Sequence, residues 1–102
     1  MKSTIQLQVM NVIDYSEAGF RLTPRLINKL CEVDAKYVRL TLTDSGVLGY
    51  GIMSACEVSH NDYIIRLDSS TNLVLSTYVY SKVLQRKVGI TEGLKGTELI
   101  FE

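Results

Sequence analysis

The segment KYVRLTLTDSGVLGYGIMSACEVSHNDYIIRLD, residues 36–68, alternates apolar and polar side chains in three successive runs. This two-residue period is typical of strands that bury one face. The runs begin near Tyr37, Val47 and Tyr63, and the second run extends to Val58. Turn-forming Asp, Ser, Asn and Gly residues separate the runs. We therefore predict an antiparallel β-meander over 36–68.

Helix signals precede the meander. Thr23 carries a hydroxyl that can cap free backbone N–H groups, and Pro24 suits the first helical position because it has no N–H to leave unpaired. Leu26 and Leu30 then recur on one helical face. We predict a helix from 24 to about 32, packed on the sheet.

The segment 72–88 permits two interpretations. Its β-branched and aromatic residues favour a strand, whereas Lys82, Arg86 and Lys87 before Gly89 are typical of a helix end. We prefer a helix and keep the strand as the alternative. Alternation over 5–9 and 98–101 predicts two further short strands.

These elements predict a single α+β domain spanning 1–102. Its expected architecture is an antiparallel sheet of four to five strands, which includes the β-meander 36–68, with one or two helices packed on one face. A chain of 102 residues can form such a core without disulfides or metal.

The composition gives no global charge to attract a phosphate backbone or a lipid surface. Lys plus Arg number 11 and Asp plus Glu number 11, so the formal net charge is zero. The hydrophobic fraction is 46% and mean hydropathy is +0.12, which is apolar for a small domain and favours a homo-oligomer. No signal peptide or long apolar run is evident, so we expect a cytoplasmic protein with no membrane partner.

Chemistry-bearing residues do not form a recognisable motif. Cys31 and Cys56 have no cysteine nearby in sequence, which favours free buried thiols over a disulfide. His60 is the only histidine, and neither a metal-ligand set nor an orienting third group accompanies it. We expect no catalytic residue, no metal and no cofactor, and hence no enzyme.

Three surfaces remain as candidate sites. Gly49 and Gly51 share one face of a predicted strand, which favours a twisted or closely crossed strand, with a ligand groove as the alternative. A second candidate combines basic residues with tyrosines, and a third is the polar face opposite the predicted core. The candidate partner-binding residues of these last two are Tyr37, Arg39, Arg66, Tyr78, Tyr80, Lys82, Arg86 and Lys87.

The function that we expect is a small non-enzymatic interaction module, a regulatory or inhibitory protein that binds a protein partner and self-associates. One alternative is a nucleic-acid-binding protein that uses the local basic and aromatic patch. The other is a small-ligand or nucleotide-binding protein with its groove at Gly49 and Gly51.

Overall fold

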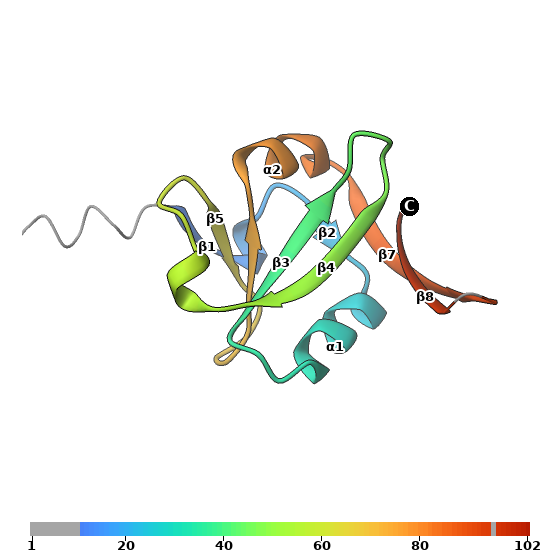
Figure 1. Ribbon diagram of the computed structural model, residues 1–102, viewed down its shortest axis with the longest axis horizontal. Coiled ribbons are helices and arrows are strands. Elements are labelled where there is room, and N and C mark those ends of the chain that lie inside the picture. The colour runs from blue at the N-terminus through green and yellow to red at the C-terminus, as the bar shows by residue number, and fades with distance from the viewer. Residues whose placement is uncertain (1–10, 95) are drawn as a thin grey trace, which may run out of the picture.

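The computed structural model describes residues 11–94 and 96–102, and this part of the chain forms one curled sheet with two short α-helices (Figure 1). The strand order is β1-β5-β6-β3-β4-β8-β7-β2, with both parallel and antiparallel pairs. The strands are β1 (Asn11–Asp14), β2 (Arg21–Leu22), β3 (Tyr37–Leu42), β4 (Leu48–Met53), β5 (Tyr63–Arg66), β6 (Asn72–Leu75), β7 (Lys87–Gly93) and β8 (Gly96–Phe101).

The two α-helices lie at opposite ends of the curled sheet (Figure 1). Helix α1 (Pro24–Glu32) begins as predicted, because the Thr23 hydroxyl accepts a hydrogen bond from the Leu26 N–H at 3.2 Å. Its Leu26 and Leu30 side chains are fully buried in the core. Helix α2 (Thr77–Val83) begins at Ser76 in the same manner and contacts β3 and β6.

Strand β6 lies at the centre of the core. It pairs in parallel with β3, opposing Val38 with Leu73, and antiparallel with β5, opposing Ile65 with Leu73. Leu73, Val74 and Leu75 have no exposed surface. Both faces of this strand are therefore covered, which explains its uninterrupted apolar sequence.

The predicted α+β fold with the β-meander 36–68 is wrong. The β3–β4 hairpin forms, but β5 pairs with β6 and β1 instead of β4, and the sheet has eight strands of mixed direction. Strand β4 ends at Met53, where Ser54 and Glu57 form a capping box around the 3₁₀ turn η3 (Ala55–Glu57). This turn ends the strand before 58, so the chain does not fold back along β4. The two helices also do not lie side by side on the sheet: they stand at its opposite ends (Figure 1) and contribute to the same core.

The preferred helix over 72–88 is also wrong as one element. The segment divides into β6, α2 and the start of β7. Gln85 adopts the left-handed backbone conformation at φ 62° and its N–H donates to the Gly19 carbonyl at 2.7 Å, which ends the helix and starts a new direction.

Other predictions agree with the described elements. Helix α1 has the predicted bounds, and the predicted strand over 98–101 lies within β8. The predicted strand over 5–9 lies outside the described residues. A 3₁₀ turn, η2 (Tyr15–Glu17), follows β1. Within 11–94 and 96–102 no helix has the length and apolar character needed to span a membrane.

The left-handed conformation of Gln85, just after helix α2, leads to a prediction about stability. Gln85→Gly should leave the free energy of unfolding unchanged or raise it by up to about 1 kcal/mol, because glycine adopts positive φ without steric cost. Urea unfolding measures the difference. A decrease of about 1 kcal/mol in the free energy of unfolding, which is the cost of glycine inside a helix, would contradict the left-handed conformation at Gln85 and support a continuous helix instead.

Candidate functional site

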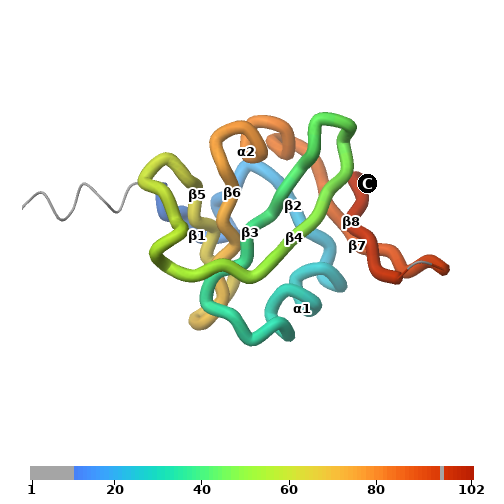
Figure 2. The backbone as a smooth tube through the Cα atoms, in the orientation of Figure 1, coloured from blue at the N-terminus to red at the C-terminus, as the bar shows by residue number. Residues whose placement is uncertain are grey.

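The outer edge of β4 has little pairing beyond β3. Strand β4 pairs with β3 over all six residues, but it meets β8 only where Leu48 opposes Leu99. Beyond this point the β7–β8 hairpin runs away from β4 (Figure 2). Among residues 11–94 and 96–102, the run from Gly49 to Met53 therefore has a strand neighbour on one side only.

The backbone N–H and C=O groups of β4 point alternately toward β3 and toward the outer edge. The Thr43 N–H donates to the Val47 carbonyl at 3.0 Å, which identifies one hydrogen-bonded pair of the hairpin. Such pairs alternate along antiparallel strands, so Gly49, Gly51 and Met53 direct their backbone groups toward β3. The N–H and C=O groups of the residues between them, at 50 and 52, consequently point away from β3.

The side chains beside these groups are apolar. Tyr50 and Ile52 lie on the same face as Leu40 and Val38, to which they are paired across the hairpin. Tyr50 packs against the core, whereas Ile52 is 68% exposed. The sequence LGYGIM of β4 contains no Lys, Pro or other residue of the kind that usually protects an exposed edge.

A groove continues this edge where β4 and β8 part. Its volume is about 700 Å³, and its exposed apolar side chains are Val47 and Ile100. Gly49 lines this groove, and a Cβ added there would lie 3.1 Å from Thr41 Oγ1. Gly51 instead lines a separate shallow hollow, and a Cβ there would meet no atom within 4 Å. The two glycines of the predicted ligand groove thus belong to different depressions.

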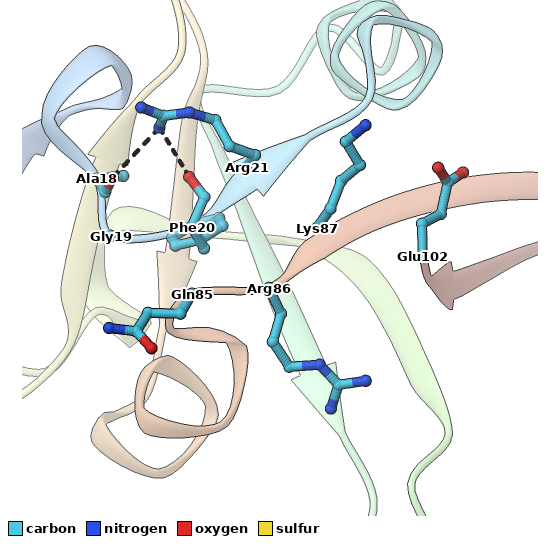
Figure 3. Close-up of a pocket in the computed structure, with 8 residues that line it drawn as sticks. All are labelled: Ala18, Gly19, Phe20, Arg21, Gln85, Arg86, Lys87 and Glu102. Carbon is cyan, nitrogen blue, oxygen red and sulfur yellow. Dashed lines mark hydrogen bonds between the residues drawn. The ribbon is translucent and has the colours of Figure 1, made fainter.

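The predicted basic residues of β7 do not converge. Arg86 and Lys87 line a hollow of about 600 Å³, but their side chains point in opposite directions (Figure 3). The Arg86 guanidinium lies 3.6 Å from the centroid of the Phe101 ring. Arg21, the cross-strand partner of Lys87 on β2, donates to the carbonyl oxygens of Ala18 and Phe20. The two arginines are therefore engaged with neighbouring groups, and Arg86 and Lys87 do not point toward a common centre.

The candidate residues of α2 have separate roles. Lys82 Nζ lies 5.5 Å from the centroid of the exposed Tyr78 ring. The Tyr80 ring stacks on Tyr63 at 4.1 Å between centroids and forms a T-shaped pair with Phe20 at 6.0 Å between centroids. Tyr80 thus belongs to the packing between α2 and the sheet, and its ring is not free to stack on a base.

The remaining candidates share the face of the sheet opposite the core. Tyr37 and Arg66 lie in one cross-strand row, with Asn72 of β6 between them. Arg66 is exposed and forms an ion pair with Asp14 at 3.4 Å. Arg39 forms a shorter ion pair, 2.8 Å, with the buried Asp62. Its guanidinium therefore fastens the loop before β5 to the sheet.

The cysteines lie on different elements and do not belong to a ligand cluster. Burial raises the pKa of the Cys31 thiol, and its hydrogen bond with the Asp68 carboxylate raises this pKa further. Cys56 lies in η3 and is exposed. In the described ranges, 11–94 and 96–102, no three His, Cys, Asp or Glu side chains are grouped to hold a metal ion. The interpretation of Cys56 as a buried thiol is wrong, because β4 ends before it.

Sequence reasoning missed Ile52 as a surface residue. Its position in the alternation with Leu48 and Tyr50 is that of a core residue. It is exposed because no strand of the described residues pairs with the outer edge of β4 at this position. The uncharged sequence LGYGIM is the signal that could have identified this edge. A strand without charged residues is either covered by a neighbouring strand or available to pair with a partner.

Comparison with known proteins relates the fold to two solved structures. No protein-family model and no curated protein matches the chain. An Aquifex aeolicus protein, solved by solution NMR, is 13% identical with a TM-score of 0.65, covering 83% of this chain and 91% of that one. Escherichia coli SufA, described as involved in the biosynthesis of iron–sulfur clusters, is 19% identical with a TM-score of 0.53, covering 82% and 79%. At these identities the likeness concerns the fold alone.

The Arg39–Asp62 pair predicts an acid-dependent contribution to stability. Burial alone would raise the pKa of Asp62, but hydrogen bonds from Arg39 and the Ser59 N–H, together with the Arg39 charge, lower this pKa below its usual range. The contribution is therefore present above about pH 4, near the unfolded pKa, and is lost as the pH falls through the folded value.

Asp62→Asn should reduce the free energy of unfolding by about 1–3 kcal/mol at neutral pH, since it removes the partner of a half-buried guanidinium. The difference from the wild type should shrink as the pH falls below about 4 and through the lowered folded pKa, because the wild-type carboxylate then becomes protonated. Urea unfolding across this pH range measures it. A difference that stays constant with pH would contradict the assignment.

Proposed function

We propose that this protein is a non-enzymatic protein-binding module that takes up an extended segment of a partner along the outer edge of β4. The observation that carries the proposal is the pair of residues Tyr50 and Ile52. Their backbone donors and acceptors are directed outward, and Ile52 itself is 68% exposed. A partner strand would satisfy these groups and cover the side chain together.

The groove next to this edge suits such a partner. In strand addition, main-chain hydrogen bonds provide affinity and pockets for alternate side chains provide specificity. The groove between β4 and β8 continues the edge, with Leu48 and Leu99 at the single point where the two strands pair. A side chain of the bound segment that enters here would contact Val47 and Ile100.

Binding to nucleic acid has less support. That alternative requires cations that follow a phosphate backbone. Arg66 and Arg86 instead lie against Asp14 and Phe101, while Lys87 points away from Arg86 (Figure 3). The net charge of zero adds no long-range attraction.

An iron–sulfur role like that of SufA does not fit the residues of this chain. Such clusters are held mainly by several Cys thiolates, four in the common types. This sequence has two cysteines, and the pKa of Cys31 is raised by burial and by Asp68, which favours the protonated thiol over a ligating thiolate. The proposal therefore takes from SufA its fold and not its role.

Substitution at the centre of the edge should abolish partner binding. Ile52→Arg should reduce the recovery of a specific partner from native cells about tenfold or more, because a buried apolar contact becomes a desolvated charge. The measurement is quantitative mass spectrometry after capture on the tagged full chain. Leu84→Arg, at another exposed apolar position outside this edge, is the matched control and should recover as much partner as the wild type. Equal losses in both variants, or no loss with Ile52→Arg, would contradict the proposal.

A further inference from the structure

Nothing in the described part of the chain, residues 11–94 and 96–102, requires glycine at position 51. Among the described glycines, positive φ occurs at Gly46 and Gly96 and not at Gly51, and a Cβ built on Gly51 meets no atom within 4 Å. Glycine in a strand interior weakens the strand and often marks a close approach by another backbone. The described residues provide no such backbone at the outer edge of Gly51.

The edge around Gly51 is complementary to itself. Tyr50 and Ile52 flank the glycine, and each directs one N–H and one C=O outward. Two copies of a strand that pair antiparallel are related by a two-fold axis. If the axis passes through Gly51, Tyr50 of each copy opposes Ile52 of the other, and the two pairs exchange about four main-chain hydrogen bonds. The exposed Ile52 side chain then packs on the tyrosine ring across the strands.

The register with Gly51 on the axis follows from where the unpaired part of the β4 edge begins and ends. Leu48 already opposes Leu99 of β8, so a second copy cannot pair beyond Gly49. At the other end, the Ser54 N–H donates to the Glu57 carboxylate at 2.9 Å and the chain leaves the sheet. The free run is therefore 49–53, and Gly51 is its midpoint.

Charge also favours a second copy as the occupant. The strand Leu48–Met53 carries no charged residue, and the whole chain has a formal net charge of zero. Two copies thus approach without the repulsion that charged edge residues normally provide against self-pairing. The same strand therefore provides both sides of the contact. The backbone groups and side chain of Tyr50 in one copy meet those of Ile52 in the other copy.

We infer that the partner on the β4 edge is a second copy of this chain, paired antiparallel through Tyr50 and Ile52 about a two-fold axis at Gly51. This inference rests on the proposed function and deepens it by naming the partner. The dimer joins the two curled sheets into one continuous sheet across the β4 strands.

A charge-exchange experiment tests the axis. Gly51→Lys and Gly51→Glu each place like charges opposite one another in a homodimer, whereas a mixture of the two variants places opposite charges together. Gly93→Lys and Gly93→Glu are matched controls, since a Cβ at Gly93 also meets no atom within 4 Å. Sedimentation of the full chain from micromolar to millimolar concentration measures the dimer, and circular dichroism verifies that each variant is folded.

The wild type and both Gly93 variants should form dimers with the same dissociation constant. Each Gly51 variant alone should raise this constant at least about tenfold, and mixing the two should restore dimers. Unchanged dimers in the single variants, or no restoration in the mixture, would overturn the axis at Gly51. A wild-type dimer that disappears when residues 1–10 are deleted would also overturn it, because the pairing would then belong to that segment.

A wild-type chain that stays monomeric at millimolar concentration would overturn the second copy as partner. The proposed function would still stand in that case if capture of another protein depended on Ile52. If neither a dimer nor Ile52-dependent capture is found, both the proposed function and this inference fail.

Discussion

The parallel pairing of β6 with β3 is the contact on which the rest of the structure depends. It places Leu73 beside Val38 and covers both faces of β6, so the centre of the core is built from a strand that arrives late in the chain. Because β6 takes the inner edge of β3 and also pairs with β5, no strand within 11–94 and 96–102 remains for the outer edge of β4 beyond Leu48. The exposed edge is thus a consequence of how the core is completed.

Local signals predict local elements well in this chain. The Thr23 hydroxyl and Pro24 define the start of α1, and the alternation from Tyr37 through Gly46 defines the β3–β4 hairpin, because each depends on groups only a few residues apart. The order of strands depends on contacts between distant residues. Three short alternating runs are equally compatible with a meander and with the insertion of β6 between β5 and β3.

The segment 72–88 shows a second limit. Leu73, Val74 and Leu75 form a continuous apolar run, which periodicity alone cannot distinguish from a buried helix. The turn at Gln85 is made without the glycine that usually indicates a left-handed residue. The candidate site has the same origin: Ile52 has the sequence pattern of a core residue, and its exposure follows from a missing neighbour rather than from its own chemistry.

Residue-resolved amide hydrogen exchange on a dilute, monomeric sample tests most directly whether β4 has one strand neighbour between Gly49 and Met53. The N–H groups of Gly49, Gly51 and Met53 face β3 and should be protected, whereas those of Tyr50 and Ile52 should exchange rapidly. Equal protection of Tyr50, Gly51 and Ile52 in the monomer would show a strand on the outer edge, as in the predicted meander, and would contradict this account.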